Sequence, residues 1–302
     1  MMVPRSRRLP WLLAAFLSAC DGDAAPPLTD ASDGMPPVDA PPAVDAAPRC
    51  APTSPWTAPR LLPSVNTPDS ELYARLSADE LTLVGRIDST RLTIATRSDR
   101  ASTFPVAAPL DLGQSTEAFT SPSITGDGST LYFIAGVGTA PRIWRARRAS
   151  PSTPFADVGP VAELAAVTDA ASVYVLPDES ALYIATGSFG GPVTRAARGA
   201  GGAFGAPVEV AGVVGLTPVV SADELTILFA TRATGANDSH VWMGTRPTTA
   251  APFGSIAQVP VVDAPGLDHP TWISPDDCRL YLHSDRTGGS GGFDYYVAER
   301  AP

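Results

Sequence analysis

The chain has 302 residues, with 31 acidic and 21 basic side chains and a net charge of −10 at pH 7. All 21 basic residues are Arg, because the sequence contains no Lys. This acidic balance argues against nucleic acid and anionic lipid headgroups, so neither is expected as a partner. After two unusual N-terminal segments, about 250 residues remain from Cys50 onward, which is enough for one large all-β domain.

Residues 1–19 have the pattern of a secretory signal peptide. Three arginines precede an apolar run at 11–17 that is too short to cross a membrane by itself. The sequence Leu17-Ser-Ala-Cys20 resembles the bacterial lipobox, and this resemblance implies that Cys20 is lipidated and becomes the mature N-terminus. A plain signal peptide with an incidental Cys is the alternative. The expected location is the bacterial cell envelope, periplasmic or at the outer surface, with inner and outer membrane both left open.

Residues 20–49 follow as a lipidated Cys and a tether composed largely of Ala, Pro and Asp. Such a composition cannot bury a core, because it supplies almost no large apolar side chains. We expect a disordered, extended and semi-rigid acidic segment.

One pattern occurs five times and organises the rest of the chain. Four of its five copies begin with Ser or Thr, and each has an Asp at the third position and an aliphatic residue four positions after that Asp. The five aspartates are Asp79, Asp127, Asp178, Asp223 and Asp276. Ser and Asp side chains favour tight turns, and the branched and aromatic runs that follow them, such as 131–134, predict strands.

Two further markers recur in the same order. An Arg closes a second short strand, and a large aromatic residue opens another. The arginines are Arg97, Arg147, Arg198, Arg246 and Arg300, and the aromatics are Trp56, Phe104, Phe155, Phe204 and Phe253. A repeat of roughly 40–50 residues with four strands predicts a β-propeller, here five four-stranded blades over 50–302. Because Trp56 precedes the first inner strand, the ring should close by an N-terminal outer strand pairing with the last blade.

The last repeat carries a family resemblance. Its segments Asp268-His-Pro, Ser274-Pro-Asp276, Ser284-Asp285-Arg286 and Phe293-Asp294-Tyr295 resemble the WD40-like (PD40, TolB-type) propeller repeat. The resemblance extends over about 56–300 and implies the same propeller fold. The third and fourth repeats depart from the pattern: Leu176 and Pro177 stand where Ser-Pro or Ser-Ala is usual, and Gly187-Ser-Phe-Gly-Gly191 lacks the usual Ser-Asp-Arg.

Two cysteines remain in the domain. Cys50 lies just before the closing outer strand, and Cys278 begins the second strand of the last blade. These positions lie on one face about 10 Å apart, or two strand spacings, which the residues between Cys50 and Trp56 can bridge. An envelope domain experiences an oxidising environment, so we expect a Cys50–Cys278 disulfide. Two free buried thiols are the alternative.

Catalytic motifs are not convincing. Gly288–Gly292 matches the nucleophile-elbow pattern, but it lies between two strands with no helix after it, so Ser290 is not expected to be a nucleophile. We find no metal motif and no cofactor loop and expect neither ligand. Among the histidines, His269 is near a plausible site, whereas His283 is expected to pack or cap on a strand.

Charged residues gather in loops that should share the face of the channel mouth. The predicted binding residues are Asp69, Glu71, Glu117, Asp169, Asp268, His269, Arg86, Arg232, Asp285 and Arg286. Loops on a rigid scaffold are where binding sites collect, and we expect the carboxylates before the inner strands to be exposed. A solvated rim without function is the alternative.

The sequence therefore predicts a membrane-anchored, non-enzymatic scaffold, expected as a monomer, that binds an envelope protein, peptide or glycan. One alternative is a propeller-type glycoside hydrolase, which needs two carboxylates about 5–10 Å apart at the channel mouth. A purely structural envelope protein is the other.

Overall fold

A computed structural model describes residues 49–88, 91–113, 118–136, 141–232 and 238–301. The signal peptide 1–19, the lipidation site Cys20, nearly all of the tether and Glu117 lie outside these residues. The description below concerns the unit Ala47–Pro302. None of the helices in the described segments is long and apolar enough to cross a membrane.

The described unit consists of antiparallel sheets. Two four-stranded sheets come first: β2 (Glu71–Leu76), β3 (Thr82–Ile87), β4 (Arg91–Thr96), β5 (Ala108–Pro109), and then β6 (Phe119–Ile124), β7 (Thr130–Ala135), β8 (Arg142–Arg147), β9 (Ala156–Pro160). A seven-stranded sheet follows: β10 (Ala170–Val175), β11 (Ala181–Thr186), β12 (Gly191–Ala197), β13 (Val208–Val220), β14 (Thr226–Thr231), β15 (His240–Thr245), β16 (Gly254–Gln258). Two short 3-10 helices are η1 (Ala162–Leu164) and η2 (Pro260–Val262).

The last sheet joins the two ends of the unit. Its strands run in the order β1 (Arg60–Leu61), β19 (Asp294–Glu299), β18 (Arg279–Ser284), β17 (Asp268–Ile273). Pairing of β1 with β19, through Arg60 opposite Val297, confirms the predicted closure by an N-terminal strand. The pairing is shorter than expected because Pro59 and Pro63, which lack an N–H, flank β1.

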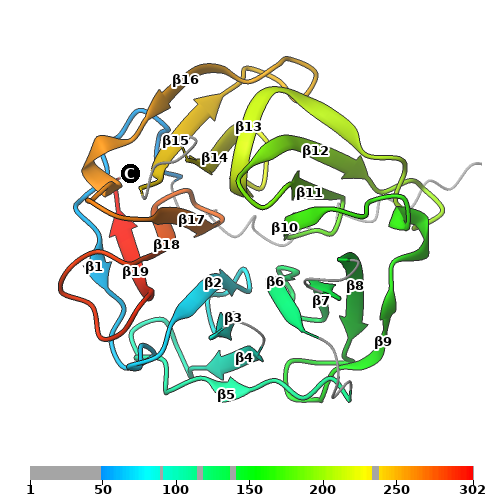
Figure 1. Ribbon diagram of the computed structural model, residues 1–302, viewed down its shortest axis with the longest axis horizontal. Coiled ribbons are helices and arrows are strands. Elements are labelled where there is room, and N and C mark those ends of the chain that lie inside the picture. The colour runs from blue at the N-terminus through cyan, green and yellow to red at the C-terminus, as the bar shows by residue number, and fades with distance from the viewer. Residues whose placement is uncertain (1–48, 89–90, 114–117, 137–140, 233–237, 302) are drawn as a thin grey trace, which may run out of the picture. The chain divides into compact units, whose positions relative to one another are not determined.

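The sheets stand around a common centre (Figure 1). Their inner strands contact one another in a closed cycle, in the order β2, β6, β10, β13, β17 and back to β2. Strands β6 and β7 are buried at every position, as predicted for strands covered on both faces. This radial packing of small antiparallel sheets is the architecture of a β-propeller.

The long strand β13 serves two parts of its sheet. Its first part pairs with β12 up to Gly215, and from Leu216 onward it pairs with β14. Gly212, with a φ of 78°, lies in the first part, where the register with β12 shifts. One strand thus passes from an outer position to an inner one without a connecting loop.

A disulfide links the segment before β1 to the last sheet. Cys50 and Cys278 are bonded with their Cα atoms 5.1 Å apart, which confirms the predicted pair. The Cys50 backbone N–H also donates to the Asp276 carbonyl at 2.8 Å. The segment before β1 is therefore attached to the turn of the last repeat.

Each repeated turn uses its Asp as predicted. In the first repeat, Ser77 Oγ donates to Asp79 Oδ1 at 2.5 Å, and the Leu81 N–H donates to the same oxygen at 2.9 Å. The next residue adopts a left-handed conformation in all repeats: Glu80, Gly128, Glu179, Glu224 and Asp277, with φ between 59° and 70°. That conformation costs a residue other than Gly about 1–2 kcal/mol, so the four acidic side chains should make compensating contacts.

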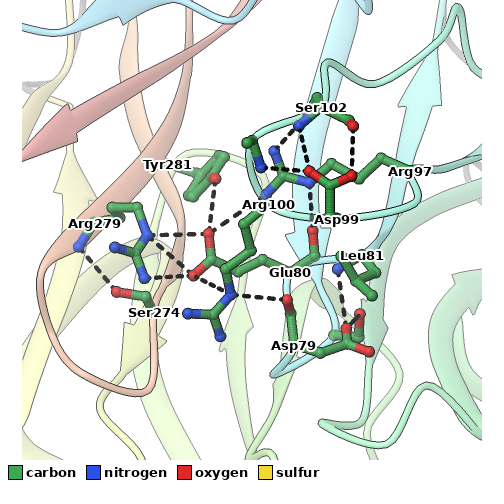
Figure 2. Close-up of polar contacts among 12 residues, drawn as sticks. Asp79, Glu80, Leu81, Arg97, Asp99, Arg100, Ser102, Ser274, Arg279 and Tyr281 are labelled. Atoms are coloured by element: carbon green, nitrogen blue, oxygen red, sulfur yellow. Dashed lines mark hydrogen bonds and ion pairs between the residues drawn. The ribbon is translucent and has the colours of Figure 1, made fainter. Parts of the chain in front are cut away.

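Figure 2 shows those contacts for Glu80. Its carboxylate is 1% exposed and accepts hydrogen bonds from Arg279 Nε at 3.0 Å and from Tyr281 OH at 3.2 Å, both on β18. Arg97 and Arg100 approach the same carboxylate to 3.7 and 3.8 Å. Glu80 therefore connects the first sheet to the last one.

The acidic residues of two other turns make the same kind of connection. Tyr132 OH donates to Glu179, and Tyr183 OH donates to Glu224, both at 2.5 Å. In each pair the tyrosine belongs to the preceding repeat. The second repeat has Gly128 at this position and so brings no carboxylate to the junction. The left-handed residues Glu80, Glu179 and Glu224 thus connect neighbouring repeats.

The other two repeat markers contact each other. The arginine guanidinium lies over the aromatic ring in every repeat: Arg97 over Phe104 (4.4 Å), Arg148 over Phe155 (4.6 Å), Arg198 over Phe204 (5.7 Å), Arg246 over Phe253 (4.3 Å) and Arg300 over Trp56 (4.3 Å). In the second repeat Arg147 closes the strand as predicted, but the arginine that stacks on the aromatic ring is the next residue, Arg148. Arg147 ends β8 in the strand ladder, whereas Arg148 turns back and donates from Nε to the Gly128 carbonyl at 2.6 Å.

Candidate functional site

A cavity of about 340 Å³ lies where the inner strands meet. Each inner strand contributes one wall residue at the same repeat position: Leu72, Thr120, Ala171, Leu216 and His269. The other lining residues come from neighbouring positions and loops: Tyr73, Arg86, Pro141, Ala170, Ser172, Ser188, Thr217, Arg232, Leu267, His283 and Phe293. The cavity is therefore built by the whole ring and not by one repeat.

Bulges in the inner strands shape this wall. The register shifts in all of them, and the bulged residues Tyr73, Ser121 and Thr217 have positive φ of 61°, 50° and 46°. A bulge leaves backbone groups unpaired and re-aims side chains. Side chains of the neighbouring repeat satisfy two of these groups: Tyr73 N–H donates to His283 Nδ1 at 3.2 Å, and Thr217 N–H donates to Ser172 Oγ at 3.1 Å.

Two arginines give the cavity a positive charge. Arg86 donates from Nη1 to Thr120 Oγ1 at 2.7 Å, and its guanidinium lies 5.3 Å from the centre of the Tyr73 ring. Arg232 lies 5.8 Å from the centre of the Phe189 ring, at another part of the rim. Among the described residues that line the cavity, none is Asp or Glu. This combination of guanidinium, hydroxyl and aromatic groups suits an anionic group on a ligand.

Two histidines form a neutral part of the wall. The rings of His269 and His283 are stacked with centroids 4.9 Å apart; His283 is buried, and His269 is partly exposed to the cavity. Burial lowers the pKa of His269 to about 4 and the pKa of His283 well below its usual value. Both rings are therefore uncharged near pH 7. His283 lies on strand β18, where it was expected to pack or cap, and it also lines the cavity.

Three of the predicted binding residues lie at this cavity: Arg86, Arg232 and His269. Asp268 does not, because its carboxylate is fully buried and accepts a hydrogen bond from Arg286 at 2.5 Å. This ion pair joins β17 to the loop after β18. It holds the wall in place from outside the cavity.

The other predicted carboxylates that the structure describes are also outside the lining. Glu71 is 1% exposed and accepts from Thr67 Oγ1 at 2.5 Å, and Asp285 accepts from the Leu267 N–H at 2.6 Å. Asp69 and Asp169 are exposed at the rim. The expected exposure is thus wrong for Glu71 and Asp268, because each is the first residue of an inner strand and not part of a loop.

A second cleft, of about 310 Å³, lies between the first and last sheets around Glu80. Its arginines are already engaged: Arg279 pairs with Glu80, and Arg60 pairs with Glu299 at 2.8 Å. Elsewhere in the described parts of the chain, no group of three His, Cys, Asp or Glu residues could hold a metal ion. The central cavity is therefore the better candidate site.

Comparisons with known proteins concern the fold. No protein-family model matches the chain, and no curated protein is similar to it. Among solved structures, TolB from Acinetobacter baumannii matches with 17% identity and a TM-score of 0.47, over 76% of this chain and 55% of that one. The chain thus spans about half the length of that TolB.

Two other solved structures match over most of both chains. The PQQ-bound aldose sugar dehydrogenase from Streptomyces coelicolor has 13% identity, a TM-score of 0.49 and coverage of 82% of this chain and 99% of that one. A putative glycoside hydrolase from Parabacteroides distasonis has 12% identity, a TM-score of 0.51 and coverage of 84% and 96%. At 12% identity, the likeness to the putative glycoside hydrolase concerns the fold alone and agrees with a β-propeller.

Proposed function

We propose that the chain is a lipid-anchored protein of the bacterial envelope whose propeller binds a partner protein or peptide at the central cavity without catalysing a reaction. The lipid on Cys20 anchors the chain, and the tether 20–49 holds the domain away from the membrane. The domain acts as a monomer, and its ligand presents an acidic group to the cavity.

The proposal includes a propeller of five blades with TolB-type repeats. Five turns with a left-handed residue, five arginine–aromatic contacts and a cycle of five inner strands support this count. The seven-stranded sheet then represents two blades that share β13, with Gly215 ending one and Leu216 beginning the next.

One observation carries the binding proposal: Arg86 and Arg232 face a cavity whose described lining has no carboxylate. The net charge of the chain is negative, so a local cationic cavity is not a consequence of overall composition. A peptide C-terminus or an acidic side chain could pair with the Arg86 guanidinium, whose Nε has no partner within the described protein, and Tyr73 and Phe293 offer apolar contact beside it.

Glycoside hydrolysis is less well supported by this geometry. It would need two carboxylates facing the sugar from the cavity wall. Of the predicted acids, Asp268 is held by Arg286 and Glu71 by Thr67, while Asp69 and Asp169 lie on the rim outside the lining. The acid pair is thus not found among the described lining residues.

Crosslinking of the full chain in its native envelope tests the proposal. The double variant Arg86→Gln/Arg232→Gln should lose its crosslinked protein partner while keeping the wild-type unfolding temperature within a few degrees. Arg91→Gln is the matched control: Arg91 lies in the same sheet, opposite Ile87, but its side chain is exposed, pairs with Asp88 and is outside the cavity lining. Unchanged crosslinks in the double variant, or crosslinks only to a glycan, would contradict the proposal.

A further inference from the structure

Arg75 lies inside the ring, beyond the cavity. It follows the lining residues Leu72 and Tyr73 on β2, and its side chain is 0% exposed. Its guanidinium carbon is 4.8 Å from the centre of the Tyr174 ring on β10. Because β6 lies between β2 and β10 in the cycle of inner strands, this contact reaches across the centre of the ring.

No described residue supplies a hydrogen-bond acceptor to the guanidinium of Arg75. Within the described protein, Nε, Nη1 and Nη2 are all buried and unpartnered. Guanidinium groups are strong donors, and an unpaired buried charge is strongly destabilising. Stacking on Tyr174 offsets only part of this cost, because a ring face supplies no lone pair to the N–H groups.

The charge is retained at neutral pH. Burial lowers the pKa of Arg75 from its usual value to about 10, which still leaves the side chain protonated at pH 7. The other groups that act on it are the hydroxyls of Tyr174 and Tyr73, not a carboxylate. Asp277, the acid that acts on Tyr174, already accepts a hydrogen bond from Arg49 at 2.6 Å.

Further unpartnered groups occur on other inner strands of the ring. Thr271 Oγ1 on the neighbouring β17 and Thr217 Oγ1 on β13 are buried without a hydrogen-bond partner. Both hydroxyls can donate to an anion. One unpartnered acceptor, Glu71 Oε2, is also on β2, but that carboxylate faces Thr67 and the Asp294 side of the last sheet.

We propose that the interior of the ring binds a compact monovalent anion on the guanidinium of Arg75, with Thr271 as the neighbouring hydroxyl donor. Chloride and formate share the required chemistry, since both are small, carry one negative charge and accept several hydrogen bonds. The central cavity, with Arg86 and Arg232 at its wall, provides the cationic entrance. This anion site does not depend on the proposed partner binding.

Thermal unfolding of the purified full chain tests the site. Ionic strength is held constant with sodium gluconate, whose anion is too large for an enclosed site, while chloride or formate replaces it in two separate series. The unfolding temperature of the wild type should rise in a saturable way, by roughly 5–10 °C at a hundredfold excess over the Kd. The series that gives the shift identifies the anion.

Arg75→Met removes the charge and nearly keeps the volume, so it should abolish the shift, and in gluconate it should be at least as stable as the wild type. Arg91→Met, at an exposed arginine, should leave the shift unchanged. A wild type that does not respond to either anion, or an Arg75→Met variant that still responds, overturns the proposal.

If Arg75→Met does not fold, a wild-type crystal soaked in bromide decides: anomalous density beside Arg75 supports the site and its absence overturns it. Loss of partner crosslinks affects none of these outcomes.

Discussion

The guanidinium of Arg300 lies 4.3 Å from the centre of the Trp56 ring and so joins the end of the last repeat to the segment before β1. Arg300 also donates from Nε to the Asp277 carbonyl at 2.7 Å and from Nη1 to the Pro52 carbonyl at 3.1 Å. In the other repeats the same pair forms between residues close in sequence. Here it connects two ends of the unit, so the contact contributes to ring closure.

Replacing Trp56 should therefore destabilise the whole domain. Trp56 is 5% exposed, and Trp56→Ala should lower the free energy of unfolding by about 3–5 kcal/mol. Trp56→Phe should cost roughly 1–2 kcal/mol, because four repeats use Phe beneath their Arg. Urea unfolding followed by circular dichroism measures both. A cost below 1 kcal/mol for Trp56→Ala would show that the N-terminal segment does not close the ring.

The Cys50–Cys278 disulfide should stabilise the same junction. Its cysteines are separated by 228 residues, and removing a native disulfide typically costs 2–5 kcal/mol. The double variant Cys50→Ser/Cys278→Ser should lose about this much and become insensitive to a reducing agent, whereas the wild type should lose it only on reduction. Mass mapping that finds both thiols free in the unreduced chain would contradict the prediction.

The sequence predicts the features that depend on local chemistry and repeat. Asp79 and its equivalents fix turns through bonds to nearby backbone, so their spacing reveals the blades. Cys50 and Cys278 could be paired because the repeat order places both at one junction. Arg148 could not be singled out as the stacking residue because two adjacent arginines fit the pattern equally well, and only the strand end separates them.

Features that depend on neighbouring repeats could not be predicted. Glu80 resembles an exposed turn residue in sequence, yet it is buried between the first and last sheets. Glu71 and Asp268 precede apolar runs and resemble loop residues, but each is already paired in its ladder, Glu71 with Ile87 and Asp268 with Ser284, and so begins an inner strand. Likewise, Arg75 resembles an ordinary polar residue on a half-exposed strand in sequence. It is buried because its strand faces the centre of the ring, which only the assembled repeats create.

Glu80 should make a measurable contribution to the contact between the first and last sheets. Glu80→Gln removes the charge that Arg279 and Arg97 approach, and it should lower the free energy of unfolding by about 2–3 kcal/mol. The value is below that of a fully buried pair because Arg279 is partly exposed. Glu299→Gln is the control, since its pair with Arg60 is exposed and should be worth less than about 1 kcal/mol. Equal effects of the two substitutions would refute a special role for Glu80.

The left-handed backbone at Glu80 gives a separate prediction. Both Glu80→Ala and Glu80→Gly remove the carboxylate, but only Gly adopts a φ of 62° without strain. Glu80→Gly should therefore be more stable than Glu80→Ala by about 1 kcal/mol, as measured by urea unfolding. Gly128 has the same left-handed backbone conformation, so Gly128→Ala should destabilise the domain by a similar amount. If Glu80→Ala is the more stable variant, the turn does not hold this conformation in solution.

Burial of His269 should make stability depend on pH between about 6.5 and 4. The unfolded imidazole takes up a proton as the pH falls below 6.5, whereas the folded one remains neutral until about pH 4. The unfolded state thus binds more protons in this window, and stability falls as the pH falls, by up to about 1.4 kcal/mol per pH unit. His269→Gln should reduce that slope relative to the wild type. The slope that remains comes from His283 and the carboxylates. Urea unfolding at pH 7.5, 6, 5 and 4.5 measures the difference, and equal slopes for the two proteins would show that the ring is solvated in the folded state.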